Sequence, residues 1–450
     1  MTIQQELLRD AFAAYRGEQY GPLVASLSLP DINPVSRSTF NTIYCKPPQK
    51  ETSYDYFRTI RRATGYNAYF HIPFCRTECI YCSYDKVPRP SVELIADYLR
   101  ALETEIGRKR DILGDVFAPD IFYMGGGTPT VLSVEQMERY LLMLGCRFDL
   151  RNNREFTVET TPEAILRPGG DELLALLKEH GVNRINVGVQ SFSDSVVRRN
   201  GRQQSAGDVA ACFARLKQTG FDKLNLDLIY GLVGQTPEVW LHDLESAVAL
   251  QPDSITTFSL RVRPPSRLHD MIIHGDVTPP AERDVLVMRM IAQKFLPDAG
   301  FGEDNADYFI KSPDKRYLYQ PFQPHNVDRN LIGFGPSAYS LAGDRQIFNV
   351  RGTDQYLRAV AGNEDPIAYS IELTREEQMR KRLAEGLRTS FDDTAFYGAF
   401  GVSVHEAFGG ALLQLREWGV VEGDAELRLT PKGKVLHDYV AGYIRGCAVG

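Results

Sequence analysis

The chain has 450 residues, 43% of them hydrophobic and 24% charged, which is ordinary for a soluble protein of two or three domains. The formal net charge of -7 has the opposite sign to that of proteins that bind nucleic acid non-specifically. The longest apolar runs have the length of a strand, and residues 1–17 lack the basic and apolar regions of a secretory signal. We therefore expect a cytoplasmic protein that binds neither nucleic acid nor membrane.

Short segments rich in β-branched and aromatic residues alternate with segments of helical periodicity. The helical pattern is clearest over residues 91–113, 171–181 and 237–250. The predicted strands cover residues 67–73, 120–127, 155–162, 184–191, 223–231 and 254–262. Strand, helix and strand in repetition predict a parallel sheet with right-handed crossovers, either an open doubly wound sheet or a partial barrel.

Polar or glycine-rich chemistry recurs at the same end of these strands. A group of cysteines follows the first strand, and the sequence GGGTPT ends the second. Glu159, Gln190 and Asp227 lie late in the third, fourth and fifth strands. Function in parallel α/β folds collects at the carboxyl ends of the strands. The coincidence predicts one shared active site.

The flanks of the strand region differ from it in composition. Residues 1–60 are Pro-rich and irregular and predict an N-terminal arm or lid. We divide the rest into a barrel (61–300), a flanking extension (301–375) and a C-terminal module (376–450). The pattern of residues 411–440 predicts a helix, a short hairpin and a second helix, which is the order of elements in a winged helix. Because the chain is acidic, we expect a structural or lid role for this module rather than DNA binding.

Three of the seven cysteines, Cys75, Cys79 and Cys82, form a C-x3-C-x2-C pattern. A structural zinc site would need a fourth ligand, such as His71 or a distant residue. A redox pair would use Cys79 and Cys82 alone. A [4Fe–4S] cluster held by three thiolates uses all three cysteines and leaves one iron open to a chelating group, such as the amino and carboxylate groups of a methionine. The other cysteines are interpreted as ordinary thiols.

This pattern, with an aromatic residue before its last cysteine, resembles the signature of the radical S-adenosylmethionine (SAM) superfamily. YFHIPFC, GGGTPT, VNRINVGVQSF, NLDLIYGLVGQTPE and LIGFGPSAYS, in this order, resemble one branch, the oxygen-independent coproporphyrinogen III oxidase-like enzymes. The resemblance covers residues 66–345, and the C-terminal module fits the same branch. It implies an α/β fold, a partial parallel (β/α)6 radical SAM barrel with a helical, winged-helix-like C-terminal module.

The resemblance also implies roles for individual residues. Cys75, Cys79 and Cys82 would hold the [4Fe–4S] cluster, and Tyr69 and Glu159 would act as catalytic residues beside the cluster and SAM. The positions implied to contact one or two SAM molecules are Tyr69, Tyr81, Gly126, Gly127, Thr128, Glu159, Gln190, Arg202, Asp227, Arg261 and Tyr339. Arg261 and Tyr339 differ in type from the residues expected there.

The implied chemistry is a one-electron cleavage of SAM. The reduced cluster gives an electron to the sulfonium, and the resulting 5′-deoxyadenosyl radical takes a hydrogen atom from an organic substrate. A flavodoxin or ferredoxin-type donor is implied as partner, with a small molecule or a tetrapyrrole as substrate.

The chain departs from the family at two places. Tyr84 stands where the porphyrinogen decarboxylases tend to carry a further cysteine, and their N-terminal segment is not found. His325 and Asn326 match part of the haem-chaperone signature, but its Tyr-Trp pair is absent. Because the resemblance retains the second-site positions Gln190, Arg202 and Asp227, we expect a methylase or cyclopropanase-type reaction with a second SAM bound, either as the methyl or methylene donor or as a second radical source. The alternatives are a porphyrin-directed enzyme (coproporphyrinogen III decarboxylase or anaerobic haem-degrading enzyme), a haem carrier with little turnover, and a barrel stabilised by a structural zinc ion.

Overall fold

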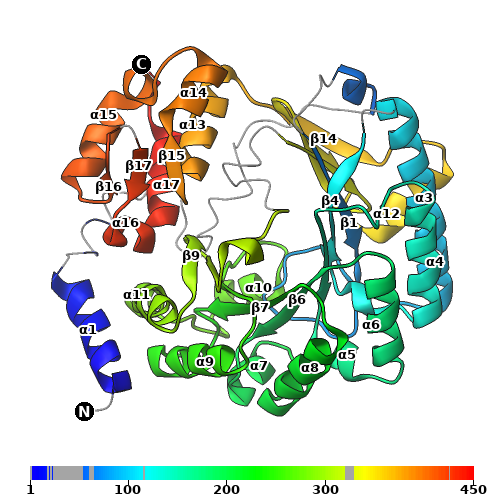
Figure 1. Ribbon diagram of the computed structural model, residues 1–450, viewed down its shortest axis with the longest axis horizontal. Helices are drawn as coiled ribbons and strands as arrows, with labels where there is room; N and C mark the ends of the chain where they lie inside the picture. The colour runs from blue at the N-terminus through cyan, green and yellow to red at the C-terminus, as the bar shows by residue number, and fades with distance from the viewer. Residues whose placement is uncertain are drawn as a thin grey trace.

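The structure is a computed structural model that describes residues 3–17, 20, 23, 54–59, 65–114, 117–319, 329–424 and 426–449. Its centre is a 12-stranded sheet in the order β14-β13-β12-β11-β1-β4-β5-β6-β7-β8-β10-β9. The sheet is strongly curved, with helices on its outer side and the C-terminal module beside it (Figure 1).

The middle of the sheet consists of parallel strands that follow one another in chain order. They are β1 (Tyr66–Ile72), β4 (Pro119–Gly126), β5 (Glu155–Thr160), β6 (Arg184–Gln190), β7 (Lys223–Tyr230) and β8 (Ser254–Ser259). Each agrees with a strand predicted from the sequence. Most of their residues are buried, because helices cover one face and aromatic side chains the other.

Helices connect these strands along the outer face. The longer ones are α3 (Val92–Leu113), α4 (Val134–Gly145), α6 (Gly170–Glu179), α8 (Ala206–Thr219), α9 (Pro237–Ala249) and α11 (Glu282–Asp298). The short ones are α5 (Pro162–Leu166), α7 (Asp194–Arg199) and α10 (Arg267–Ile273). Local sequence fixes several starting points: Ser91, Ser133 and Ser205 accept hydrogen bonds from first-turn amides, the last two within capping boxes.

Further strands extend the sheet on both sides. Next to β1 lies β11 (Asn330–Phe334), also parallel, followed by antiparallel β12 (Tyr339–Ala342), β13 (Arg345–Asn349) and β14 (Ile367–Glu372). Next to β8 lie antiparallel β10 (Tyr308–Ile310) and β9 (Gly302–Asn305). In the part of the chain that the structure describes, no pairing joins β14 to β9. The barrel is thus open, as the partial-barrel prediction requires.

The segment before residue 320 crosses the amino ends of the central strands. Glu155, at the start of β5, accepts hydrogen bonds at Oε1 from the backbone amides of Leu318 (2.9 Å) and Tyr319 (3.1 Å). The guanidinium of Arg184, which is fully buried, lies 4.6 Å from the centre of the Tyr317 ring. This packing closes the amino end and leaves the carboxyl ends of the strands for chemistry.

The C-terminal module combines helices with a small sheet. Its helices are α13 (Arg375–Gly386), α14 (Asp393–Phe400), α15 (Val404–Glu417), α16 (Pro431–Val435) and α17 (His437–Gly446). Helix α12 (Thr353–Ala361), which precedes β14, lies outside this module and packs on α3. Its strands are ordered β15 (Ser390–Asp392), β17 (Glu426–Leu429) and β16 (Val421–Glu422). The run α15, β16, β17, α16 is the helix, hairpin and helix predicted from residues 411–440.

The N-terminal region contains a helix that the sequence analysis did not predict. Helix α1 (Ile3–Gly17) lies beside α11, at the lower left of Figure 1. A 3₁₀ turn, η2 (Tyr54–Thr59), packs on α3. Most of the predicted arm lies outside the described residues, so its role as a lid, like the four-part division of the chain, stays a prediction.

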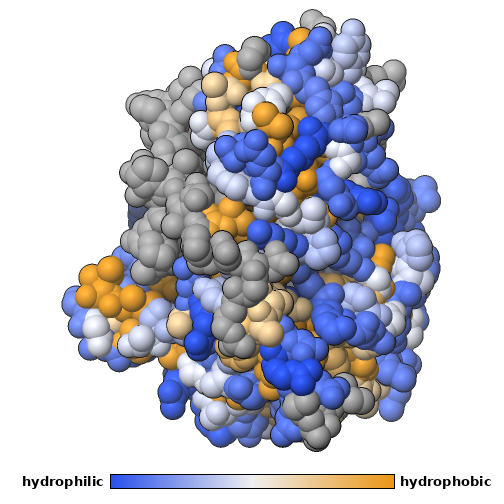
Figure 2. Space-filling model, turned by 90° about the vertical axis from the view of Figure 1, so that its left-hand side faces the viewer, coloured by the Kyte–Doolittle hydropathy of each residue, from blue (hydrophilic) through white to orange (hydrophobic). Residues whose placement is uncertain are grey.

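Hydrophilic residues dominate the face shown in Figure 2, with apolar residues in small scattered groups. Among the described helices, none has the length and apolar composition that a bilayer span requires.

Candidate active site

The three clustered cysteines lie at the carboxyl end of β1. Cys75 ends the short strand β2 (Phe74–Cys75), and Cys79 and Cys82 follow in the loop to β3 (Val87–Pro88). All three thiols are free and half-buried. Burial, and next the neighbouring Cys82, raise the pKa of Cys75 to about 12, and burial also raises the pKa of Cys82. Ionising these thiols together therefore requires a positive charge, which a bound metal cluster supplies.

Backbone contacts from distant segments hold this cysteine loop in place. The amide of Ile80 donates to the carbonyl of Asn200 (3.2 Å), and its carbonyl accepts from the amide of Leu268 (2.7 Å). A Cβ atom on Gly201 would lie only 2.6 Å from the carbonyl oxygen of Glu78. The chain segments after β6 and β8 therefore pack directly on the loop and set the positions of its sulfurs.

His71, the nearby candidate for a fourth zinc ligand, is engaged elsewhere. Its Nδ1 lies 2.9 Å from the hydroxyl of Tyr69, and its Nε2 lies 3.2 Å from the carbonyl oxygen of Asp85. Within the described residues, no three His, Cys, Asp or Glu side chains are arranged to hold a single metal ion. The geometry gives the zinc alternative no support.

The glycine turn after β4 is packed too closely for side chains. A Cβ on Gly125 would lie 2.6 Å from Oε2 of Glu159, and one on Gly127 would lie 2.5 Å from the carbonyl oxygen of Phe74. Gly126 has a φ of +105°, in the region that favours glycine. The three glycines thus let the turn, the cysteine loop and Glu159 meet.

The amides of this turn already have protein acceptors. Gly126 donates to Oε2 of Glu159 (3.1 Å), Gly127 to the carbonyl of Ile72 (2.8 Å) and Thr128 to the carbonyl of Phe74 (2.7 Å). A ligand at the turn would therefore meet main-chain carbonyl oxygens, which suit an ammonium group. Contact of Gly126, Gly127 and Thr128 with SAM stays a prediction.

Tyr69, Glu159 and Asp227 are half-buried positions within otherwise largely buried strands. Tyr69 and Tyr123 belong to an aromatic cluster that is separate from the core between sheet and helices. Tyr69, Glu159 and Asp227 thus face the barrel interior and not the helices, which matches the predicted convergence at the strand ends. Their roles in catalysis and SAM binding stay predictions.

The two carboxyl groups are poised to titrate near neutral pH. Burial raises the pKa of Glu159 to about 7, with the charge of Asp227 adding to it, although the Tyr123 hydroxyl donates a hydrogen bond to Glu159. Burial also raises the pKa of Asp227 to about 6, against hydrogen bonds that include one of 2.6 Å from Asn225. A bound cation would favour the ionised form of both groups.

Gln190 ends β6 with a φ of 72°. Its Oε1 atom is buried and has no hydrogen-bond partner among the described residues. A buried unpaired acceptor is unfavourable unless a ligand supplies a donor. This observation favours the predicted contact between Gln190 and SAM.

Arg202 turns toward the cysteine loop. Its guanidinium donates to Oε1 of Gln204 (2.9 Å) and to the carbonyl of Gly188 (2.6 Å), and lies 3.6 Å from Sγ of Cys79. The buried hydroxyl of Tyr81 also lies near Cys79. Burial is the main cause of the raised pKa of Tyr81, and the charge of Cys79 raises it further. Both residues thus approach a cluster cysteine, and their contact with SAM stays a prediction.

Tyrosine rings line the interior between these polar groups. The Tyr69 ring lies 5.9 Å from that of Tyr123 and 6.5 Å from that of Tyr339, and Tyr123 stacks on Tyr319 at 4.3 Å. The sequence analysis missed Tyr123 and Tyr319. Tyr123 could have been found, because it stands two positions before Gly125 on the same face of β4; Tyr319 follows no motif.

The structure does not test the remaining predicted contacts. Arg261 follows β8, and its contact with SAM, like that of Tyr339, stays a prediction. His325, together with Asn326, lies outside the described residues.

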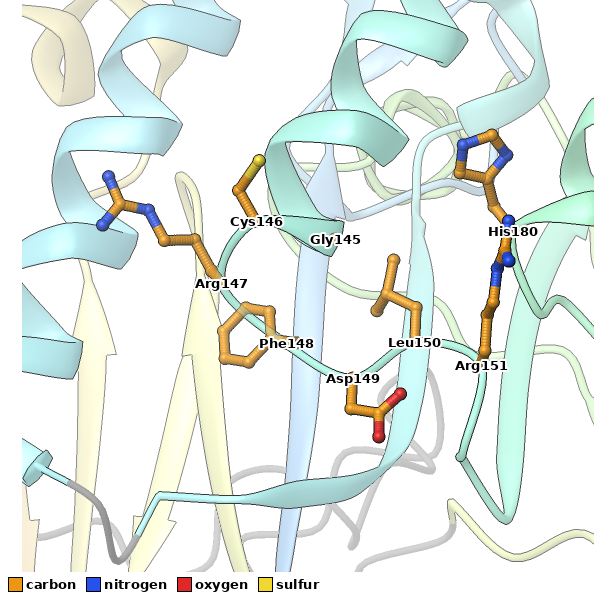
Figure 3. Close-up of a pocket in the computed structure, with 8 residues that line it drawn as sticks. All are labelled: Gly145, Cys146, Arg147, Phe148, Asp149, Leu150, Arg151 and His180. Carbon is orange, nitrogen blue, oxygen red and sulfur yellow. The ribbon is translucent and has the colours of Figure 1, made fainter.

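A pocket of about 500 Å³ opens at the other end of the barrel, between the end of α4 and the start of β5 (Figure 3). Cys146 and His180 stand on different sides of it (Figure 3). It contains none of the predicted site residues, so we assign it no part in the chemistry.

Comparison with known proteins agrees with this geometry. The family model of the Radical SAM superfamily matches residues 69–247, and that of the HemN C-terminal domain matches residues 373–436. The heme chaperone HemW of Bacillus subtilis (strain 168) is 30% identical over 391 residues, which cover 84% of this chain and 99% of that protein. The chain belongs to the HemN/HemW family of radical SAM proteins.

The chain is also similar to proteins named as oxidases. The oxygen-independent coproporphyrinogen III oxidase of Salmonella typhimurium (strain LT2) is 29% identical over 385 residues, 82% of each chain. The solved structure of coproporphyrinogen III oxidase (HemN) from Escherichia coli matches with a TM-score of 0.75 at 24% identity, over 87% of this chain and 93% of that one. The resemblance and the fold class read from the sequence are confirmed.

A radical SAM protein of this family uses a [4Fe–4S] cluster and SAM, so the cofactors expected from the sequence are confirmed. The half-buried thiols of Cys75, Cys79 and Cys82 fit such a cluster, since soft thiolates are its usual ligands. Cys146, Cys212 and Cys447 lie on other elements, and Cys45 lies outside the described residues. The assignment of the three ligands stays a prediction, which the Discussion takes up.

We expect the affinity of this radical SAM protein for SAM to rise between pH 6 and pH 8. The neutral Glu159 carboxyl, with a pKa of about 7, loses its proton over this range and gains attraction for cationic SAM. The ionised fraction grows roughly tenfold, so the dissociation constant should fall by nearly that factor. Equilibrium dialysis with SAM under anaerobic conditions measures it.

In this dialysis Glu159→Gln should bind more weakly and with little dependence on pH. The exposed Glu238→Gln is the control and should follow the unchanged protein. A remaining pH dependence of the dissociation constant, centred near pH 6, would be due to Asp227. An unaltered slope around pH 7 in Glu159→Gln contradicts the assignment.

Proposed function

We propose that this radical SAM protein is an oxidoreductase that acts on a tetrapyrrole bound in the barrel interior. The observation that carries the proposal is that the cysteine loop, Glu159 and Asp227 lie toward the carboxyl ends of the central strands, beside a cluster of tyrosine rings. The polar groups suit SAM, and the cysteine loop suits a cluster. The neighbouring tyrosine rings can stack on a flat, unsaturated substrate.

The family cofactor, when bound, supplies the electron and the radical chemistry. The protein's residues bind SAM and the substrate and orient them. The unpaired Oε1 of Gln190 and the carboxylates of Glu159 and Asp227 accept hydrogen bonds from ammonium or ribose groups of SAM. The tyrosine walls exclude water from the reacting atoms. A flavodoxin or ferredoxin-type protein is the proposed electron donor, and a second SAM remains part of the proposal.

The names of the relatives support a tetrapyrrole. Relatives described above are an oxidase of coproporphyrinogen III and a chaperone of heme. They give no support to the methylase or cyclopropanase reaction that the sequence analysis preferred, and we do not propose it. Tyr84, where a cysteine was expected of the decarboxylases, distinguishes this site from theirs.

The test is an anaerobic reaction of the cluster-loaded protein with SAM, dithionite and coproporphyrinogen III. We expect 5′-deoxyadenosine and methionine, released faster when the porphyrinogen is present. A product that has lost carbon dioxide and two hydrogens from each propionate it converts would show oxidative decarboxylation. S-adenosylhomocysteine in place of the deoxynucleoside would show methyl transfer. A loaded cluster without either nucleoside contradicts the proposal.

A haem carrier is the second candidate, because the chain covers 99% of the length of the heme chaperone from Bacillus subtilis. In a haem titration of the same preparation, a carrier shows stoichiometric binding and little deoxyadenosine. Loss of the haem spectrum in His325→Ala would favour this candidate, and absence of binding would remove it.

A further inference from the structure

A buried arginine beside the cysteine loop directs one of its nitrogens at a sulfur of that loop. Arg202 is only 6% exposed, and its Nη1 atom donates a hydrogen bond of 3.6 Å to Sγ of Cys79. The preceding residue, Gly201, packs so closely on the loop that a Cβ atom there would lie 3.3 Å from the Cα atom of Cys79. This contact between the two backbones places the guanidinium beside the sulfur.

Two neutral groups fix the orientation of this guanidinium. Its Nε atom donates to Oε1 of Gln204 (2.9 Å), and its Nη2 atom donates to the carbonyl of Gly188 (2.6 Å). Gln204 is itself buried and held by a hydrogen bond of 2.7 Å from its Nε2 atom to the carbonyl of Val189. Because a guanidinium presents its donors in a rigid planar fork, fixing two of its nitrogens determines where the third one points. Nη1 is therefore directed at the cysteine sulfur.

The charge of Arg202 has no carboxylate beside it. Among the described residues, Arg202 forms no ion pair, and Glu163 acts on it from a greater distance and less strongly than Cys79 does. Lys86, on the loop itself, differs, because its Nζ atom lies 3.3 Å from Oε1 of Glu78. A buried cation without a counter-charge is unfavourable. An ionised Cys79, which a cluster ligand would be, supplies that charge.

We propose that Arg202 raises the reduction potential of the [4Fe–4S] cluster by donating an N–H···S hydrogen bond to Cys79. Net charge and hydrogen bonds to the sulfurs are among the factors that set the potentials of such clusters. One-electron reduction adds a negative charge to the cluster and its thiolates. A cation fixed beside one sulfur therefore stabilises the reduced state more than the oxidised state.

Arg202 thus acts through Cys79 and is a positioning residue. It makes the cluster easier to reduce, which favours electron transfer from the donor protein. The inference takes Cys79 as a cluster ligand, and it does not depend on which substrate the site binds.

The test is a redox titration of the anaerobically reconstituted full-length protein without SAM or substrate, in which EPR spectroscopy measures the reduced cluster. We expect Arg202→Gln to lower the equilibrium constant for reduction by about tenfold or more, which shifts the midpoint potential downward by about 59 mV or more for one electron. Arg202→Lys keeps the charge without the fork and should recover part of the potential.

Arg198→Gln is the matched control for this titration. Arg198 belongs to the helix that precedes Arg202, but it is exposed, and its Nη1 atom lies 3.5 Å from Oδ2 of Asp194. The control should have the potential of the unchanged protein. Iron and acid-labile sulfide contents show whether each variant holds its cluster.

A second measurement uses the unchanged sequence and does not depend on the folding of a variant. The protein is labelled with ¹⁵N in its arginine guanidinium groups and reduced without SAM. Pulsed EPR spectroscopy then searches for a coupling between the labelled nitrogens and the cluster spin. We expect such a coupling, because Nη1 of Arg202 lies beside Sγ of Cys79.

Equal potentials in Arg202→Gln and the unchanged protein overturn the inference, and so does the absence of an arginine coupling. A weaker affinity for SAM at an unchanged potential would assign Arg202 to SAM binding instead. If Arg202→Gln holds no cluster, the labelling experiment decides. Because neither measurement needs turnover or a porphyrin, failure of SAM cleavage together with the expected potential shift would refute the proposed function alone.

Discussion

The Cys82→Ala variant is expected to lose the cluster absorbance near 400 nm and the release of 5′-deoxyadenosine. Cys82 is one of the three half-buried thiols at the carboxyl end of β1, and a cluster held at three irons has no spare protein ligand. Changes that merely support a metal ligand cost about 10–100-fold, so removing a ligand should cost at least about a hundredfold in rate. Iron and acid-labile sulfide analysis after anaerobic reconstitution, with nucleoside chromatography, measures both effects.

Cys146→Ala is the matched control for this experiment. Cys146 is exposed and lines the pocket at the opposite end of the barrel (Figure 3). The variant should keep the iron content and the nucleoside release of the unchanged protein. Full absorbance and undiminished cleavage in Cys82→Ala would refute the three-thiol site.

Glu105→Ala is expected to destabilise the protein more than any surface change. Glu105 lies in the middle of α3, and its carboxylate is fully buried. It accepts hydrogen bonds of 2.7–2.8 Å from Lys109 Nζ, Tyr54 Oη, Asn349 Nδ2, Gly335 N and Tyr356 Oη. Removing it leaves the buried Lys109 ammonium uncompensated, which typically costs about 3–5 kcal/mol.

Urea unfolding, followed by circular dichroism, measures this loss as a lower transition midpoint. The control is Glu103→Ala on the exposed face of the same helix, expected to lie within about 0.5 kcal/mol of the unchanged protein. Glu105→Gln keeps the shape without the charge and should lie between the two. A loss below about 1 kcal/mol in Glu105→Ala would mean that Lys109 finds another partner or is neutral.

The local patterns of the sequence determined the central architecture. Alternating apolar runs gave the parallel strands from β1 to β8, because such strands are short and buried on both faces. The spacing of Cys75, Cys79 and Cys82 pointed to cluster chemistry, since a three-thiolate pattern has few other uses. Glu159 and Asp227 could be assigned to one site because the carboxyl ends of parallel strands share one edge.

Contacts between distant segments could not be read in this way. The pairing of β11 with β1 and the docking of Tyr319 on Tyr123 join positions about two hundred residues or more apart, and no local period encodes them. The helix α1 was missed because the Pro-rich stretches that follow it dominated the interpretation of residues 1–60.

The sequence by itself thus determined the order of strands and helices, the cluster motif and the edge of the sheet where chemistry occurs. Only the tertiary structure decided which buried polar groups at this edge lack a hydrogen-bond partner among the described residues. The unpaired oxygen of Gln190 arises from what packs around it. Burial depends on the assembled fold. A buried polar group without a hydrogen-bond partner is unfavourable, and a ligand that supplies the partner removes this cost.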